Sequence, residues 1–483
     1  MTNTLHRKDR IKLIREMYGT YNFKHRICLI GCGAIGRALL FMIHKIIKMD
    51  PQNITIIDKR DITTEIPQLL QSMRYINQAV TRENYKSLFS FLTKNDIIID
   101  CAYNVSTEDM LKFCQEKHIH YINSALYDWN PEENDVLIID RFKSLEALNR
   151  SFKTKNFNGI VTMGCNPGNV SIWTKLGLEL MNKIYNKKYT THADLAQQLG
   201  VQVIHISERD TQRSSIPKQA NEYCNTWSTD SMSYYEELTG YTEGSWGTHE
   251  KLFKMIKTVK DNYFIIDRMS LYIFAQSYTP LSGRYLGNIV PHEETYTIGK
   301  TLTIKTDGEI TYKPSVYYVY HPCNDARLSI EEFKDRSLKP QEQHRLLTDE
   351  IINGRDELGI LFFLTNKEIY WTGSLLSIDE AREIYEYKFD EFINATIVQV
   401  MVGYLSGLIH IIDLISQTTN LGIITPDDLP HNKILKLSFP FLGEFIFKKI
   451  TDFSLCDMSL KVDDDTCDKT QDWQLENFLV YKS

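Results

Sequence analysis

The first part of the chain alternates short apolar runs with stretches in which apolar residues recur at helical spacing. Four apolar runs predict β-strands, at 26–30, 54–57, 96–100 and 120–122. Two helices are predicted between them, at 34–49 and 106–117. Nearly continuous apolar strands that alternate with helices are typical of a parallel sheet with both faces covered. This region therefore predicts a right-handed βαβ series.

The pattern changes after about residue 165, where tyrosine and tryptophan become more frequent. Strand-like runs among helical segments predict antiparallel pairing and a domain of α+β type; they lie at 263–267, 301–305 and 315–320. A long apolar helix is predicted at 394–415, with Asn394 as its N-cap. Gln399, His410 and Asp413 interrupt this segment, so we expect a buried helix and not a membrane span.

A glycine-rich turn follows the first predicted strand and opens the first predicted helix. Gly31 permits the tight turn, and Gly33 lets the backbone approach a pyrophosphate because it has no Cβ. Gly36 lets the helix pack closely on the sheet. The free N–H groups of the first helical turn, at Ala34 and Ile35, then face the phosphates. The loop therefore predicts a dinucleotide site.

Two further residues complete the predicted cofactor site. Asp58 ends the second strand, 22 residues after Gly36, where a carboxylate accepts hydrogen bonds from the adenosine ribose. A carboxylate also repels a 2′-phosphate and so favours NAD over NADP, although Lys59 and Arg60 follow directly and would invert that preference. Ala102, after the strand at 96–100, is small enough for a cofactor to lie against the backbone.

Composition narrows the class of protein. The net charge of −7 and the pI of about 6.0 argue against a nucleic-acid partner, which usually requires a basic excess. Nine cysteines lack paired or zinc-binding spacing, so we expect reduced thiols and no metal site. The N-terminal residues lack an apolar secretory core. We therefore expect a cytoplasmic protein with no membrane partner.

Six downstream motifs carry candidate chemistry: CNPGNVS (165–171), HISERDTQ (205–212), NTWS (225–228), WGTHE (246–250), VPHEE (290–294) and GRDELG (354–359). Taken singly, each fits a turn, a surface ion-pair set or a satisfied core residue. Together with GCGAIG (31–36), and in this order, they resemble the bacterial-type homospermidine synthases, relatives of saccharopine dehydrogenase.

The pattern along the chain, together with this resemblance, predicts an α/β architecture in three parts. A Rossmann-type NAD-binding domain is expected at 1–165 and an α+β substrate-binding and dimerisation domain at 166–393. The C-terminal segment, 394–483, is expected to pack its helix, 394–415, back on the Rossmann domain. A homodimer is implied as well.

The resemblance also implies a reaction. Homospermidine forms from two putrescines, or from spermidine and putrescine, by oxidation to an imine, amine exchange and re-reduction. The redox balance is zero, so the enzyme is a transferase that keeps NAD as a prosthetic group. No lysine stands out as a Schiff-base nucleophile, so the imine is expected to be free.

Three residues take catalytic roles by match to the family motifs. Trp227 is expected to contact a substrate cation with its ring face and to stabilise the iminium. Glu208 matches the pocket acid and is expected to pair with an amine. His292 is expected to shuttle a proton, because histidine titrates near neutrality.

Four further residues are expected to bind the substrate. Asn166 presents its amide to the nicotinamide or the substrate, although a turn before a helix also accounts for it. Asp356 is expected to anchor the distal amine, and either Glu236 or Glu237 to be a second pocket acid.

Two other functions stay open at this point. A carboxynorspermidine- or saccharopine-type NAD(P)-dependent reductase would act on an amino-acid-like imine and need an arginine clamp for its carboxylate. Arg209, Arg284 and Arg355 are available for that purpose. An NAD-sensing scaffold without catalysis would leave the acidic and aromatic motifs without a purpose.

Overall fold

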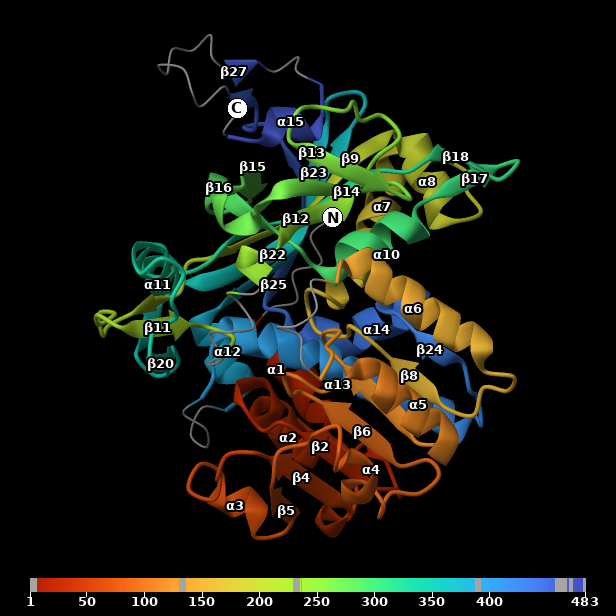
Figure 1. The fold of residues 1–483 in the computed structure, drawn as a ribbon, viewed down its shortest axis with the longest axis vertical. Coiled ribbons are helices and arrows are strands. Elements are labelled where there is room, and N and C mark those ends of the chain that lie inside the picture. Colours follow the sequence, from red (N-terminus) through yellow and green to blue (C-terminus); the bar gives the residue numbers. More distant parts are fainter. Residues whose placement is uncertain are drawn as a thin grey trace.

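Two β-sheets and a helix between them organise the chain. The computed structural model describes residues 7–129, 136–228, 235, 237–386, 392–456, 467–468 and 472–480. A seven-stranded parallel sheet occupies the lower half of Figure 1, and a ten-stranded mixed sheet occupies the upper half. Helix α13 (Ala395–Ser416) lies at the junction of the two halves, so one helix borders both sheets.

The parallel sheet is built from strands of both chain ends. Its strands, in spatial order, are β24 (Gly422–Ile424), β8 (Asn158–Ile160), β7 (His120–Asn123), β6 (Ile97–Asp100), β2 (Ile27–Ile30), β4 (Ile54–Asp58) and β5 (Arg74–Asn77). Every neighbouring pair is parallel, which confirms the predicted parallel sheet. The C-terminal segment supplies β24, so this sheet is complete only after most of the chain has been made.

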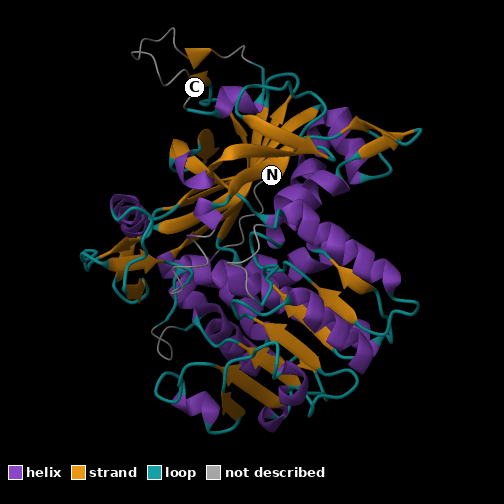
Figure 2. Ribbon diagram, viewed as in Figure 1, coloured by secondary structure: helices purple, strands orange, loops and turns teal. Residues whose placement is uncertain are grey.

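Helices cover the parallel sheet on both faces (Figure 2). The helices of seven or more residues are α1 (Arg7–Met17), α2 (Ala34–Ile46), α5 (Thr107–Lys117), α6 (Ile138–Ser151), α7 (Asn169–Tyr185), α8 (His192–Leu199), α10 (Glu293–Thr301), α11 (Asn324–Asp335), α12 (Ile378–Ile384), α13 and α14 (His431–Ser438). Shorter helical turns are α3 (Pro67–Leu70), α4 (Tyr85–Leu88) and α15 (Leu475–Phe478).

Strand β2 illustrates why the sheet strands are apolar throughout. Ile27 and Leu29 pack into the core that contains α2 and α13, whereas Cys28 and Ile30 pack into the core that contains α5 and α6. Successive side chains of a strand point to opposite faces, so both faces of β2 are buried.

The mixed sheet is largely antiparallel. Its main path is β13 (Ile256–Lys260), β14 (Tyr263–Met269), β12 (Tyr241–Ser245), β19 (Ser315–His321), β9 (Val201–Asp210), β22 (Arg355–Leu364), β23 (Ile369–Ser377) and β25 (Glu444–Ile450), with β15 (Phe274–Thr279) and β16 (Gly283–Val290) attached to β19. Only the pairing of β9 with β19 is parallel among these strands. The predicted antiparallel pairing is therefore confirmed.

Short strands form five two-stranded sheets beside the two large ones. They pair β1 (Tyr21–Asn22) with β3 (Ile47–Lys48), β10 (Arg213–Ser214) with β21 (Ile351–Asn353), β11 (Glu222–Asn225) with β20 (Gln343–Leu346), β17 (Ile304–Thr306) with β18 (Glu309–Tyr312), and β26 (Leu455–Cys456) with β27 (Cys467–Asp468).

Some predicted boundaries were wrong. The helix expected at 34–49 ends at Ile46, because the next two residues pair with β1. The strand expected at 301–305 was also wrong, since α10 continues to Thr301 and β17 begins at Ile304. The predicted N-cap is confirmed, since the Asn394 side chain accepts a hydrogen bond from the Ile397 amide at 2.8 Å.

Cysteine chemistry departs from expectation at one position. Seven cysteines are free: Cys28, Cys32, Cys101, Cys114, Cys165, Cys224 and Cys323. Cys456 is disulfide-bonded, so the prediction of reduced thiols was wrong there.

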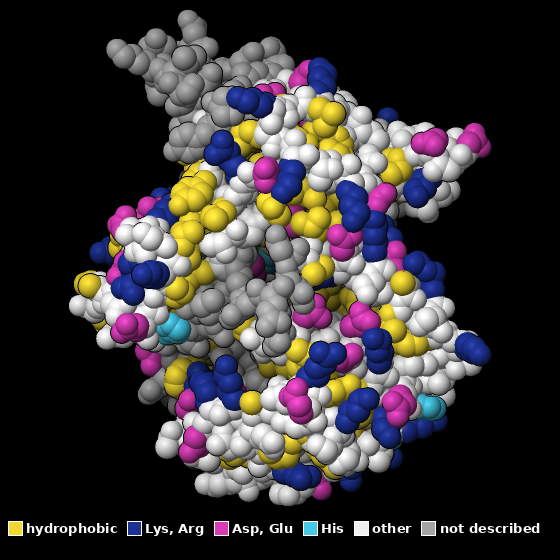
Figure 3. Space-filling model, in the orientation of Figure 1, with side chains coloured by type: hydrophobic (Ala, Val, Ile, Leu, Met, Phe, Trp, Pro, Cys, Tyr) yellow, Lys and Arg dark blue, Asp and Glu magenta, His cyan; other side chains and the backbone are white. Residues whose placement is uncertain are grey.

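The charged surface is mixed. The face drawn in Figure 3 intersperses lysine and arginine with aspartate and glutamate, without a continuous block of either sign. The described residues on this face form no basic stripe of the kind that binds nucleic acid.

Helix α13 packs by direct backbone contact. It is the one helix among the described residues that is long and apolar enough to cross a membrane, and 94% of its most apolar window is buried inside the protein. A Cβ at Gly403 would lie 1.9 Å from the Gly164 carbonyl oxygen. The Tyr404 hydroxyl donates a hydrogen bond to the Asp100 carbonyl at 2.7 Å. The helix therefore rests against the carboxyl edge of the parallel sheet.

The closeness of this contact predicts unequal costs for two identical substitutions. Gly403→Ala should lower stability by about 1–3 kcal/mol, because its Cβ meets a backbone carbonyl that cannot turn away. Gly407→Ala is the matched control, since its Cβ meets the side chains of Ile122 and Met163, at 2.7 Å and 2.8 Å. The thermal unfolding midpoint should fall further for Gly403→Ala than for Gly407→Ala, because side chains can shift where a backbone carbonyl cannot; equal midpoints would contradict the packing argument.

Candidate functional site

The glycine loop has the geometry that a bound phosphate requires. Gly31 adopts a φ of +78°, and a Cβ there would lie 2.8 Å from the Cys101 carbonyl oxygen. A Cβ at Gly36 would lie 2.2 Å from the Gly31 carbonyl oxygen. Gly33 differs, since a Cβ there would meet nothing within 4 Å. Packing thus accounts for Gly31 and Gly36, whereas the open space at Gly33 leaves room for a ligand.

Helix α2 begins at this loop, with Gly33 as its N-cap. The amides of Ala34 and Ile35 belong to its first turn, where N–H groups have no partner within a helix. Such amides attract anions, an effect that the helix dipole reinforces. The predicted phosphate-binding residues are therefore brought together.

Asp58 holds the glycine loop in place. Its carboxylate accepts hydrogen bonds from the amides of Cys32, at 2.6 Å, and Arg60, at 2.8 Å. The Arg60 guanidinium donates to the Cys32 carbonyl at 3.1 Å. A carboxylate has about four acceptor positions, so Asp58 keeps capacity for ribose hydroxyls. The Arg60 side chain, by contrast, is hydrogen-bonded to the glycine loop.

A cavity of about 1160 Å³, its mouth included, opens between the two sheets. Its wall is acidic and aromatic. The described carboxylates that line it are Asp100, Glu208, Glu237 and Glu293. The aromatic residues are Tyr103, Tyr127, Trp227, Tyr318, Tyr320 and Tyr404. No lysine or arginine is among the described lining residues. A wall of this kind suits a cationic ligand.

Strand alternation directs Glu208 into this cavity. On β9, Ile204 and Ile206 pack into the core beneath α7, and Glu208 continues the same face. Arg209 lies on the opposite face, with its guanidinium 5.9 Å from the Tyr285 ring centroid. Glu208 and Arg209 are adjacent in the sequence, but their side chains therefore lie on opposite faces of the sheet.

Glu208 is buried and hydrogen-bonded. Its Oε2 accepts from the Asn166 amide and from the Tyr318 hydroxyl, both at 2.6 Å. Burial raises the pKa of Glu208 to about 7, although these two hydrogen bonds oppose the rise. Glu208 therefore changes its charge near neutral pH.

Two further carboxylates lie behind Glu208. Asp210 and Asp356 are cross-strand neighbours on β9 and β22, and both are buried. Burial raises the pKa of Asp210 to about 6, and burial with the charges of Glu208 and Asp210 raises the pKa of Asp356 well above its usual range. Neither Asp356 oxygen has a well-aligned hydrogen-bond partner among the described residues. Burial therefore favours the neutral, protonated forms of these acids, and a nearby positive charge would favour their ionised forms.

His292 is held by an acidic neighbour. Its Nδ1 lies 2.7 Å from Glu294 Oε2, and its ring centroid lies 4.6 Å from that of Tyr318. Burial lowers the pKa of His292, but the charge and hydrogen bond of Glu294, with the charge of Glu237, raise it to about 10. The prediction that His292 titrates near neutrality was therefore wrong, because these acids raise its pKa and favour its protonated form.

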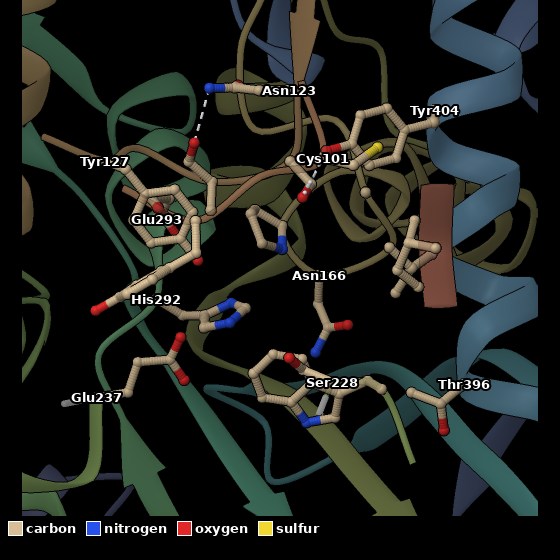
Figure 4. A pocket seen from close by; sticks show the side chains of 18 of the residues that line it. Cys101, Asn123, Tyr127, Asn166, Ser228, Glu237, His292, Glu293, Thr396 and Tyr404 are labelled. Carbon is tan, nitrogen blue, oxygen red and sulfur yellow. Dashed lines mark hydrogen bonds between the residues drawn. The ribbon is translucent and has the colours of Figure 1, made fainter. Parts of the chain in front are cut away.

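Trp227 reaches the cavity from the segment after β11. The preceding residue, Thr226, donates its hydroxyl to Asp210 at 2.7 Å. Its carbonyl accepts from the Asn394 amide at 2.5 Å, so the N-cap of α13 also holds this segment. Figure 4 shows Asn166 and His292 pointing into the cavity, with Glu237 on the side of His292.

Most of the residues predicted to act at the site converge. Those that line the cavity are Ile35, Ala102, Asn166, Glu208, Trp227, Glu237 and His292. Gly31, Gly33, Ala34, Gly36 and Asp58 form the glycine-loop end, outside the cavity lining. Asp356 is fully buried and lies outside the lining. Glu236 lies outside the described residues.

Several lining residues were missed from sequence. Tyr318 and Tyr320 alternate along β19, and Tyr320 pairs in register with Glu208. The alternation of these two tyrosines was visible in the sequence, but their position beside Glu208 on the neighbouring strand was not. Asp100 is the last residue of an apolar strand, and Glu293 directly follows His292. The position of each residue beside a predicted feature was therefore the signal that could have identified it.

The arginine clamp expected for a carboxylated ligand does not line this cavity. Arg209 and Arg284 line a separate depression beside Tyr285 and His321. Arg355 is absent from the described lining of the main cavity. The site therefore has the opposite polarity to that of a carboxylate-binding pocket.

Known proteins resemble this chain over most of its length. Residues 27–154 match the family model of the saccharopine dehydrogenase NADP binding domain. A homospermidine synthase of Blastochloris viridis is 31% identical over 478 residues, which cover 94% of this chain and 97% of that protein. A homospermidine synthase of Mesorhizobium japonicum is 29% identical over 479 residues, covering 94% and 96%.

Solved structures agree as well. The homospermidine synthase of Legionella pneumophila in complex with NAD has a TM-score of 0.87 and 31% identity, covering 96% of this chain and 100% of that one. Apo saccharopine dehydrogenase of Saccharomyces cerevisiae has a TM-score of 0.53 and 10% identity, covering 88% and 100%, which shows a shared fold alone. The sequence identity over nearly the whole length, together with the cavity, shows that the chain belongs to the homospermidine synthase family.

Proposed function

We propose that this chain makes homospermidine from two putrescines, or from spermidine and putrescine, with NAD as a prosthetic group. One observation carries the proposal: a cavity walled by carboxylates and aromatic rings, with no lysine or arginine among its described lining residues, opens beside a dinucleotide loop. Diammonium substrates need such a wall, whereas carboxylated substrates need arginine.

The glycine-loop end fits NAD. The open space at Gly33 and the first-turn amides of α2 suit the pyrophosphate, and Asp58 suits the adenosine ribose. Ile35 and Ala102 line the cavity, so they would border the nicotinamide. When bound, NAD would accept a hydride from the carbon that bears an amine of the donor and return it to the imine formed with the second amine.

Aromatic rings would stabilise the cationic substrate and the iminium. A cation over a tryptophan face gains about 0.5–2 kcal/mol, and more where water is excluded. Trp227 would supply that face, and Tyr318 and Tyr320, stacked at 5.6 Å between centroids, would extend it. Glu237 and Asn166 would orient the amines at the two sides of the cavity.

Proton transfer is required because an ammonium group neither attacks an imine nor donates a hydride. Glu208 is the better base near neutral pH, since its pKa is about 7. His292 would exchange protons only after a bound dication opposes Glu294 and Glu237 and lowers its pKa. Asp356 would attract the distal amine from behind Glu208. No lysine is among the described lining residues, which supports a free imine.

We further propose a homodimer in the cytoplasm, with 1–165 as the cofactor domain, 166–393 as the substrate and dimer domain, and 394–483 as a segment that packs back. The family resemblance supports this division. A solution mass equal to that of one chain would contradict the dimer.

Isotope retention tests the reaction directly. Putrescine deuterated at both terminal carbons, incubated with the protein and catalytic NAD, should give ammonia and homospermidine that keeps every deuterium, without net NADH. Mass spectrometry of the product and absorbance of the cofactor provide the readout. Net NADH accumulation, or activity only with a carboxylated substrate, would contradict the proposal.

Replacing the cation-binding ring tests the role of Trp227. Trp227→Ala should lower kcat/KM by about tenfold or more, because the ring contributes roughly 0.5–2 kcal/mol to cation binding and more in a dry site. Trp227→Phe is the matched control and should retain most activity, since it keeps a ring face. Cofactor binding should be the same in both variants; equal kinetics would remove Trp227 from the mechanism.

The raised acid pKa values predict pH-dependent binding of putrescine. Acids whose pKa rises on folding stabilise the protein below their unfolded pKa, and that stability is lost as pH rises through their folded pKa. The pKa values of Glu208 and Asp100 are both about 7. As pH rises from about 5 to about 8, ionisation of these two buried acids therefore destabilises the folded protein when no cation is bound beside them. A diammonium ligand binds the ionised form, so its affinity should rise over the same window, by up to about tenfold per pH unit for each proton released.

Calorimetry on NADH-loaded protein provides this measurement, because oxidation of putrescine is then blocked. Glu208→Gln should bind putrescine more weakly and with a shallower pH dependence. An affinity that is flat or falls between about pH 6 and pH 8 in the unmodified protein would show that these carboxylates need not ionise.

A further inference from the structure

Two histidines and one glutamate converge at the junction of three helices, apart from the cavity. Glu179 lies on α7, His192 is the first residue of α8 and His431 is the first residue of α14. Their ligand atoms all lie within 4.8 Å of one another. None of the three lines the main cavity, so the proposed reaction leaves this cluster without a role.

Both imidazoles present the same ring atom to one carboxylate oxygen. Glu179 Oε1 lies 3.2 Å from His192 Nε2 and 2.9 Å from His431 Nε2. The two rings stand nearly perpendicular, at 89°, with centroids 5.1 Å apart. His431 Nε2 is buried and makes no hydrogen bond of acceptable geometry despite its short distance to Glu179. The ring nitrogens and the oxygen thus surround a common point.

The donor set identifies the ion that would occupy that point. Two imidazole nitrogens and one carboxylate oxygen suit zinc, whereas magnesium and calcium prefer oxygen donors alone. Ligands at zinc distances in a tetrahedron lie about 3.3 Å apart, close to the two nitrogen–oxygen separations of 3.2 Å and 2.9 Å. The side chains of Glu179, His192 and His431 are 25%, 21% and 15% exposed, so an ion can enter and keep one water.

We propose that Glu179, His192 and His431 bind one zinc ion, with water in the fourth position. The spacing of the three residues along the chain offers no zinc motif, which is why the sequence predicted no metal.

The position of the cluster indicates what the ion would do. Helix α7 follows β8 of the parallel sheet and leads to β9 of the mixed sheet, and α14 lies between β24 and β25 in the same way. Both helices are therefore crossovers between the two sheets. One zinc ion would join them at the edge of the molecule.

Other contacts already join these crossovers along one stripe of α7. Ser171 donates to the Asp427 carboxylate at 2.9 Å, and Lys175 donates to the Asp427 carbonyl. Ser171, Lys175 and Glu179 recur every four residues and so share one helix face. The zinc ion would bind at the last of these three positions and so fix α7 to the other crossover. The first turn of α7 directly follows the loop that carries Asn166, a cavity residue.

Zinc titration of the untagged full chain, after removal of metal by a chelator, tests the proposal. Competition with a chromophoric zinc chelator should give one ion per chain in the unmodified protein. His431→Asn and Glu179→Gln should each weaken binding by more than the roughly 10–100-fold that loss of an outer-sphere partner costs. His44→Asn, at an exposed position of α2, is the matched control and should bind as the unmodified protein does.

Two readouts separate a lost ligand from a lost fold. Zinc should raise the thermal unfolding midpoint of the unmodified protein and of His44→Asn but not of His431→Asn. Cobalt in place of zinc should give the visible absorption of a tetrahedral site, and that absorption should disappear in His431→Asn. Equal zinc affinity in all four proteins, or no saturable binding in the unmodified one, would overturn the proposal and leave a His–Glu–His cluster that binds no ion.

Discussion

The burial of three carboxyl groups on one face of one sheet is the constraint on which the site depends. Glu208, Asp210 and Asp356 lie together on β9 and β22, almost without contact with water. Removing a carboxylate from water costs several kcal/mol unless it is paired or protonated. Hydrogen bonds from Asn166 and Tyr318 offset part of this cost at Glu208, and the raised pKa values offset more by favouring the neutral acids. A ligand that brings its own positive charges completes the compensation.

The same constraint explains the aromatic wall. Aromatic rings attract cations without carrying a net charge. They therefore increase the preference of the cavity for cations, and no additional carboxylate has to be buried. Tyr318 serves both purposes, because its hydroxyl donates to Glu208 while its ring lies beside His292 and Tyr320. One side chain thereby links the acid, the imidazolium and the aromatic surface.

Helix α13 ties the two ends of the site together. Thr396, Val400 and Tyr404 line the cavity from successive turns of this helix. Tyr404 contacts the end of β6 in the parallel sheet, and Asn394 holds the segment before Trp227. A shift of α13 would therefore move the cofactor side and the substrate side at once, and its backbone contact at Gly403 leaves it little room to shift.

The sequence by itself determined four strands of the parallel sheet and two of its helices, the glycine loop, and the family to which the motifs point. These features depend on local spacing and on hydrophobic period, which a linear chain displays directly. Seven of the cavity's lining residues were also predicted, since their motifs are short and contiguous. Tertiary structure alone decided that Arg209 faces away from Glu208, that Asp356 lies behind the cavity, that acidic neighbours raise the pKa of His292, and that Glu179 meets two histidines from other helices. Each of these depends on a cross-strand partner, on burial or on helix packing, and those are set by residues far away along the chain.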